Sequence, residues 1–232
     1  MLRHTQLWLS SIALAALMAS AGAQTWDESA NGGGDAGDLP GTAQVVLGSG
    51  PLTAITGTHD DDDVDMYQIL ICDPLNFEAT TVGGAAFDTQ LWLFDLNGNG
   101  VLHNDDDPAG IGGTRSRIGV GAGNVFPANQ SWAEWASTNL PAGLYYIAIS
   151  RYNRDPRNAA NAFIWNNSPF SQQRTPDGPG APGPVDNWFG STSAGGAYTI
   201  TLSGACFVPE PASMVALGAG LAGLLGLRRR KK

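Results

Sequence analysis

Short apolar runs of strand length recur along the chain, and their spacing constrains the fold more than any other feature. The run at residues 197–203 alternates strictly, with Tyr198, Ile200 and Leu202 on one face and threonine or serine on the other. A period of two is typical of a half-buried β-strand. Glycine, proline and asparagine separate the runs, so we expect an all-β, antiparallel sandwich of jelly-roll type. The other runs lie at residues 43–47, 52–57, 65–71, 77–82, 89–95, 115–120 and 144–150.

Two segments break this pattern. Residues 24–40 lack periodicity and are rich in glycine, which predicts a flexible lead-in before one domain at residues 41–207. Residues 151–196 hold arginines, aromatics and a Pro/Gly tract, and are too long for a hairpin turn. This insertion is either an ordered functional loop or a mobile one, and its aromatics either cover a sandwich end or bind a partner.

The N-terminus has the layout of an export signal. A weakly basic start, Arg3-His4, precedes an apolar stretch at residues 7–18 and the small residues Ala21-Gly22-Ala23. This order predicts a cleaved signal peptide at residues 1–23. A transmembrane anchor is the alternative, but the apolar stretch is shorter than the about 20 residues that a span needs.

The C-terminus has three parts in order. Val208-Pro209-Glu210-Pro211 comes first, an apolar run rich in alanine and glycine follows at residues 212–227, and five basic residues come last. We predict a hydrophobic helix over the apolar run, with the basic cluster on the cytoplasmic side of the inner membrane. A plain membrane anchor is the alternative, although Pro-Glu-Pro has no use in one.

These three parts resemble the PEP-CTERM sorting signal of Gram-negative bacteria, here at residues 208–232. The resemblance implies recognition by an exosortase, a membrane protease-transpeptidase that removes the tail after export. It also implies transient insertion in the inner membrane, then delivery to the cell surface or the exopolysaccharide matrix. The expected partners are therefore the exosortase and the export machinery, with exopolysaccharide as a further candidate.

Charge excludes one class of partner. Residues 24–211 hold all 21 acidic residues and only six of the 12 basic ones, a net charge of −15. Such a segment repels phosphate backbones, so we expect no nucleic-acid binding. It also attracts divalent cations.

The only two cysteines, Cys72 and Cys206, follow an early strand and the last one. In an oxidising compartment such a pair indicates a disulfide, and two free buried thiols are the alternative.

One loop has the side-chain order of a calcium site. Asp95, Asn97 and Asn99 alternate before Gly100, and Asp106 stands at the twelfth position. We predict Ca²⁺ binding by these four residues, with a hairpin turn closed by Asp95 as the alternative. The acidic runs at residues 60–65 and 105–107 either join such a site or form a solvated face.

Several motifs together resemble the bacterial pre-peptidase C-terminal domain, over about residues 42–204. The resemblance implies a jelly-roll β-sandwich that serves as an accessory or binding module, some members of which bind calcium. The insertion at 151–196 and the long stretch at 125–138 depart from it. The motifs lie at residues 61–67, 87–95, 97–100, 104–107, 116–118 and 140–147.

Nucleophile, metalloprotease and phosphate-binding motifs are absent from the sequence, so we expect no enzyme. His59, His103 and Glu134 are the weak candidates for a base. The best-supported function is a non-catalytic exported protein with a structural or adhesive role. The alternative is a calcium-stabilised carbohydrate- or protein-binding module, with ligand stacking on Trp132, Trp135, Trp165 and Trp188.

Overall fold

The computed structural model describes residues 24–191, 193 and 195–210. The predicted signal peptide and the predicted sorting helix lie outside these residues. Within the described part of the chain, no helix is long and apolar enough to cross a membrane.

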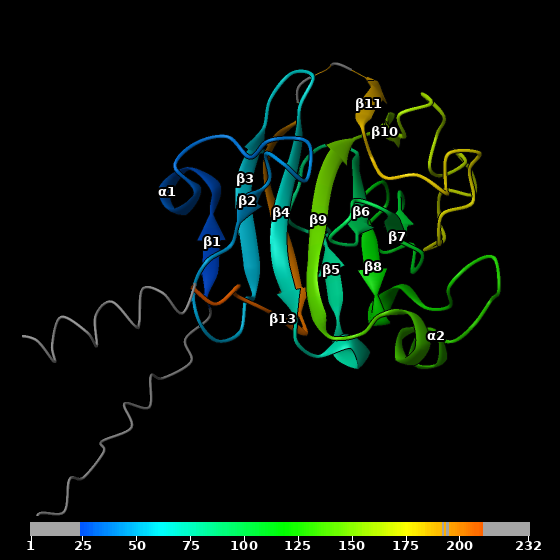
Figure 1. The fold of residues 1–232 in the computed structure, drawn as a ribbon, viewed down its shortest axis with the longest axis horizontal. Helices are drawn as coiled ribbons and strands as arrows, with labels where there is room; N and C mark the ends of the chain where they lie inside the picture. The colour runs from blue at the N-terminus through cyan, green and yellow to red at the C-terminus, as the bar shows by residue number, and fades with distance from the viewer. Residues whose placement is uncertain (1–23, 192, 194, 211–232) are drawn as a thin grey trace, which may run out of the picture.

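Two β-sheets pack face to face (Figure 1). The five-stranded sheet has the order β1-β3-β12-β5-β8, with bounds Thr25–Asp27, Ala54–His59, Gly196–Ser203, Glu78–Thr80 and Arg117–Gly119. The six-stranded sheet has the order β13-β4-β9-β6-β7, and β2 pairs with β4. Its bounds are Ala205–Cys206, Val64–Ile71, Gly143–Arg151, Thr89–Phe94, Gly100–Asn104 and, for β2, Gln44–Val45.

The helical elements are short and lie between strands. They are α1 (Glu28–Gly32), α2 (Trp132–Asn139) and the 3-10 turns η1 (Pro74–Asn76) and η2 (Val120–Ala122).

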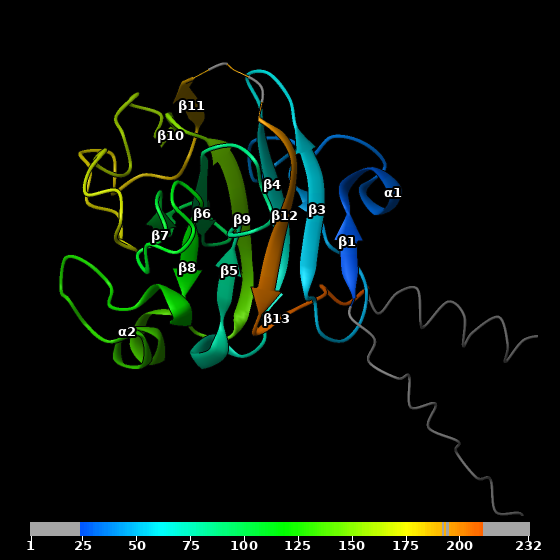
Figure 2. The same ribbon diagram turned by 180° about the vertical axis from the view of Figure 1, so that it is seen from behind.

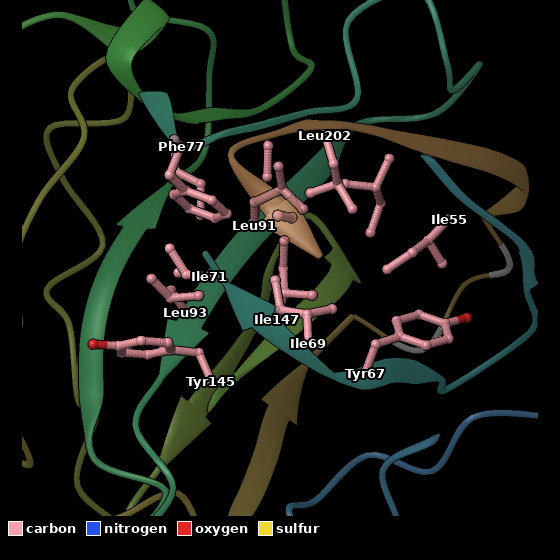
Figure 3. Close-up of a cluster of buried hydrophobic side chains, with 14 of the residues drawn as sticks. Ile55, Tyr67, Ile69, Ile71, Phe77, Leu91, Leu93, Tyr145, Ile147 and Leu202 are labelled. Carbon is pink, nitrogen blue, oxygen red and sulfur yellow. The ribbon is translucent and has the colours of Figure 1, made fainter. Parts of the chain in front are cut away.

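The main core fills the space between the sheets. Figure 3 shows Ile55 and Leu202 of the five-stranded sheet facing Ile69 and the other apolar side chains of the six-stranded sheet. The predicted alternation of residues 197–203 is confirmed, because Tyr198, Ile200 and Leu202 are buried while Thr201 and Ser203 are exposed. Each fully buried side chain of this size contributes about 1.5–3 kcal/mol.

Strand β6 is buried on both faces, which a single-faced sandwich does not explain. Leu91 and Leu93 enter the main core, whereas Trp92 and Phe94 enter a second core on the outer face of the six-stranded sheet. The insertion covers that face, with β10 (Arg154–Arg157) paired to β11 (Asn187–Gly190). Figure 2 shows its loops beside β7, at the side away from β1. Its aromatics therefore cover the sheet.

The sheets are mixed, which corrects the prediction of a purely antiparallel sandwich. Strand β1 runs parallel to β3, and β2 runs parallel to β4. Both exceptions come from the N-terminal segment, which enters along the sheet edges instead of returning through a hairpin. The protein remains mostly β.

The predicted flexible lead-in is instead part of the fold. Trp26 is 7% exposed, and its indole N–H donates to Gln44 Oε1 at 2.9 Å. Glu28 is buried and accepts the backbone N–H groups of Ala36 and Thr58, each at 3.0 Å. The contacts with Gln44 and Thr58 bridge 18 and 30 residues, so local composition gave no sign of them.

Candidate functional site

The chain leaves the domain beside the disulfide. Cys72 and Cys206 are bonded, with Cα atoms 5.8 Å apart. Beyond them, the N–H of Val208 donates to Val46 O at 2.8 Å, and its carbonyl accepts from Gly48 N at 3.0 Å. Val208 is buried, whereas Pro209 and Glu210 are exposed. The sorting motif predicted at Val208, Pro209, Glu210 and Pro211 thus begins inside the fold, with Pro211 outside the described residues.

Both ends of the described chain meet one segment. Gln24 O accepts the N–H of Thr53 at 2.9 Å, and Ala205 O accepts the N–H of Leu52 at 3.0 Å. Phe207 packs so tightly on Gly48 that a Cβ there would lie 2.6 Å from the Phe207 ring. We call the region of residues 46–53, 71–77 and 204–208 the exit end. It lies at the level of β13 in Figure 1, opposite β10 and β11.

The predicted calcium loop is a closed hairpin turn. Asp95 Oδ1 accepts the N–H groups of Asn97 at 2.8 Å and of Asn99 at 2.9 Å, and Oδ2 accepts the Asn99 amide at 2.9 Å. The carboxylate is therefore already occupied by the turn that it closes, the alternative considered for these residues.

Asp106 lies at the other end of the same hairpin. The register pairs Phe94 with Gly100 beside the turn and Leu91 with Asn104 far from it. Asp106 follows Asn104 and so continues away from Asp95. The four residues Asp95, Asn97, Asn99 and Asp106 therefore do not converge. Strand β7 runs between the turn and Asp106, so the twelve-residue spacing does not close a ligand loop.

Acidic side chains converge at the opposite end of the sandwich from the exit, which we call the acidic end. It comprises residues 28, 35, 60–65, 88, 105–107 and 155. One carboxylate oxygen from each of Glu28, Asp35 and Asp65 lies within 4.8 Å of the others. The same holds for Asp88, Asp105 and Asp106. The acidic runs at residues 60–65 and 105–107 were candidates to join a calcium site, but Glu28, Asp35 and Asp88 were not among the predicted ligands.

Asp65 is the most deeply buried carboxylate of the first set. It is 0% exposed, and neither oxygen receives a hydrogen bond of good geometry from the described residues. Burial, with the negative charges of Asp63 and Glu28, raises the pKa of Asp65 to about 10. Next to it, the hydroxyls of Tyr67 and Tyr198 are 2.5 Å apart, and Tyr67 donates to Glu28 at 3.1 Å.

The second set joins the flanks of one hairpin. Asp88 precedes β6, while Asp105 and Asp106 follow β7. Burial, with the charges of Asp106 and Asp88, raises the pKa of Asp105 to about 8. Burial, with the charge of Asp106, raises the pKa of Asp88 to about 6. A sequence signal for this set exists. A hairpin predicted over residues 89–104 brings the residues before its first strand beside the residues after its second strand.

The four tryptophans predicted to stack on a ligand are buried instead. Trp132 and Trp135 belong to α2 and pack into the main core, and Trp165 and Trp188 lie in the second core. Three of their indole N–H groups donate to backbone carbonyls, those of Leu75, Arg174 and Asp38. They serve as packing residues because each covers an otherwise exposed face of a sheet or loop.

Other aromatics are exposed near the insertion. Phe189 is 56% exposed, and its ring lies 3.9 Å from the guanidinium of Arg157, which also contacts the ring of Phe163 at 4.0 Å. Tyr152 and Phe170 form a second, partly exposed pair. A 350 Å³ cavity nearby is lined by Asn153, Asp155, Phe163, Trp165, Asn166, Asn167 and Pro179.

The candidate bases occupy structural positions. His103 is buried and stacks on Trp92 with ring centroids 3.7 Å apart, and burial lowers its pKa. His59 is 1% exposed, and burial lowers its pKa as well. Glu134 accepts the N–H and hydroxyl of Ser131 in a capping box at the start of α2.

Comparison with known proteins bears on the C-terminus. A family model described as the PEP-CTERM protein-sorting motif matches residues 207–231, which confirms the sorting signal predicted from residue 208. The motif implies an exported protein with a membrane-anchored precursor that an exosortase processes. No curated protein and no solved structure matches the chain.

Proposed function

We propose that this chain is a non-catalytic exported protein with a structural or adhesive role at the cell surface or in the exopolysaccharide matrix of a Gram-negative bacterium. The observation that carries the proposal is the sorting motif joined directly to a disulfide-closed domain. A disulfide suits an oxidising compartment outside the cytosol. The acidic surface suits a soluble extracellular module.

Terminal mass analysis of the protein recovered from the envelope and the culture medium tests this proposal. We expect a first residue near Gln24 and loss of the five terminal basic residues. Glu210→Ala should retain the tail, whereas Asp61→Ala, an equally exposed acidic residue far from the motif, should be processed normally. Full-length protein in the cytosol, with both ends intact, would overturn the proposal.

We also propose that the domain is a jelly roll of the pre-peptidase C-terminal type. The β6–β7 hairpin and its Asp95 turn fall on two of the motifs that carry that resemblance. Tyr145 adds a further contact in a third motif, since its hydroxyl donates to Pro141 O at 2.9 Å. Two facing sheets around the main core support the assignment.

The alternative function is a calcium-stabilised binding module. The specific observation behind it is the set Glu28, Asp35 and Asp65, in which a cation would tie the N-terminal segment to β4. A hard cation bound by oxygen ligands would offset the repulsion between the buried carboxylates. At a concentration 100 times its Kd, an ion bound only to the folded state adds about 2.7 kcal/mol of stability.

Thermal melting in millimolar CaCl₂ against chelator tests the calcium part. We expect calcium to raise the Tm of the wild-type protein and of Asp61→Asn, and to raise that of Asp65→Asn less. An identical Tm with and without calcium would exclude a stabilising site. This outcome leaves surface delivery unaffected, since the terminal masses report that separately.

Glycan arrays and pull-down with purified exopolysaccharide test the binding role. We expect Phe189→Ala to reduce any capture, because Phe189 is the most exposed aromatic beside the cavity. Leu96→Ala is the control, since Leu96 is also about half exposed but lies at the Asp95 turn. Absence of binding in both assays favours the structural role.

A further inference from the structure

The flanks of the β6–β7 hairpin hold a second group of carboxylates, separate from the one that contains Glu28. Asn104 pairs with Leu91 at the open end of the hairpin, so Asp105 and Asp106 leave β7 where Asp88 enters β6. Their backbones are fixed by three neighbouring segments. Asp88 O accepts the N–H of Tyr152 at 3.1 Å, Asp106 N donates to Phe170 O at 3.2 Å, and Asp106 O accepts the Asn104 amide at 2.8 Å.

Asp105 points into this group without a donor. Its side chain belongs to a residue that is 3% exposed, and Oδ1 has no hydrogen-bond partner among the described residues. Oδ1 of Asp88 is likewise buried and without a partner there. A buried carboxylate oxygen with no donor costs several kcal/mol unless a proton or a cation occupies it.

The neighbouring Asp107 shows what a satisfied carboxylate looks like at the same place. It is 1% exposed, yet it accepts Arg117 Nε at 3.0 Å, Ala109 N at 3.2 Å and Gly112 N at 2.9 Å. Two aspartates two positions apart, both deeply buried, therefore differ in the hydrogen-bond partners of their carboxylates.

The nearby arginines make their hydrogen bonds elsewhere or act at longer range. Arg115 donates to Ala85 O and Thr114 Oγ1. Arg174 donates to Ser168 O, Asn166 O and Asp177. Arg115 and Arg151 affect Asp88 electrostatically, and Arg174 affects Asp105 in the same way.

We propose that Asp88, Asp105 and Asp106 bind a divalent cation, with Ca²⁺ preferred over Mg²⁺. One oxygen from each lies within 4.8 Å of the others, close enough for one ion to contact all three. All three ligands are carboxylates, which selects a hard cation. Asp88 and Asp106 are partly exposed, so water can complete the coordination. Ligands from two loops suit the flexible coordination of Ca²⁺ better than the strict octahedron of Mg²⁺.

Calorimetric titration of the purified, chelator-stripped full-length protein in detergent with CaCl₂ tests this site. We expect Asp105→Asn to bind one equivalent fewer than wild type and to lose part of the Ca²⁺-dependent rise in Tm. Asp65→Asn separates the two groups, because it leaves the Asp88 site intact. If the double variant Asp65→Asn with Asp105→Asn binds the same amount of Ca²⁺ as Asp105→Asn, only the hairpin site takes the ion. That result would contradict the proposed Glu28 site and would leave the hairpin site standing.

Further variants test the same site in case Asp105→Asn does not fold. If Asp105→Asn fails to fold by circular dichroism, Asp88→Asn and Asp106→Asn replace it, and each should weaken Ca²⁺ binding at least tenfold. Asp61→Asn is the charge-matched control. Unchanged stoichiometry and affinity in these variants would overturn the site, and equal affinity for MgCl₂ would overturn its assignment to Ca²⁺.

Discussion

The two ends of the sandwich differ in whether their buried polar groups have hydrogen-bond partners. At the exit end, buried groups are apolar or hydrogen-bonded, and the Cys72–Cys206 bridge closes them. At the acidic end, Asp65 and Asp105 are as deeply buried but lack donors of good geometry among the described residues. Strand β4 joins the two over eight residues, about 23 Å. Hydrogen bonds and the disulfide therefore satisfy the exit end, whereas buried carboxylates without donors remain at the acidic end.

Removing the disulfide is the largest test of that contrast. The bridge closes a loop with a sequence separation of 134 residues. Replacing both cysteines by serine should lower the free energy of unfolding by about 2–5 kcal/mol. Urea unfolding of the oxidised wild type, the reduced wild type and the double variant measures the loss. A double variant as stable as the oxidised wild type would show that packing alone closes the exit end.

Removing one buried charge at the acidic end should raise the free energy of unfolding at neutral pH, whereas removing the disulfide should lower it. Burial raises the pKa of Asp155 from 3.8 to about 6, despite a hydrogen bond from Gln90 Nε2 at 3.0 Å. Because the folded pKa exceeds the unfolded one, the contribution of Asp155 to stability is full below pH 4 and is lost as pH rises through 6. The loss is about 2–3 kcal/mol at most.

Asp155→Asn should remove this part of the pH dependence. Its free energy of unfolding between pH 4 and pH 7 should fall less steeply than that of the wild type. Urea unfolding at several pH values without divalent cations measures the two slopes, and Asp61→Asn serves as the exposed control. Parallel slopes would show that Asp155 is not a destabilising charge.

The smallest expected effect concerns the Asp95 turn. It tests whether this turn is satisfied by its own hydrogen bonds, as the exit end is, or binds calcium, as we propose for the acidic end. Asp95→Ala removes three hydrogen bonds that close the turn and should cost about 1 kcal/mol. Since the carboxylate is already bonded within the turn, the Tm shift caused by calcium should stay at the wild-type value. A reduced shift would place a cation at this turn after all.

The sequence predicted what depends on local pattern. Alternation at residues 197–203 identified β12, and the hairpin alternative for the Asp95 loop matches the β6–β7 turn. It did not predict β1 and α1, because Trp26 and Glu28 are held by Gln44, Ala36 and Thr58. The contacts with Gln44 and Thr58 bridge 18 and 30 residues, which local sequence pattern does not report.

The sequence named the acidic runs at residues 60–65 and 105–107 as candidates for a cation site, but it did not give the two sets of three that form, for a related reason. Counting along the chain grouped Asp95 with Asp106, whereas strand pairing groups Asp106 with Asp88. The buried tryptophans show the same limit, because Trp188 of the insertion meets Trp92 of β6 only in the folded structure. Spacing along the sequence can indicate a ligand set within one loop, whereas a ligand set at the ends of strands depends on how the strands pair.

The union of Cys206 with Cys72 also decides how the domain responds to mechanical load. Any pull on the chain beyond Glu210 enters the domain through Val208 and passes at once to a covalent link. From Cys72 the force spreads into β4, which is hydrogen-bonded to β9 on one side and to β13 on the other. Peeling from the C-terminal end is therefore limited to the residues after Cys206 for as long as the bridge is intact.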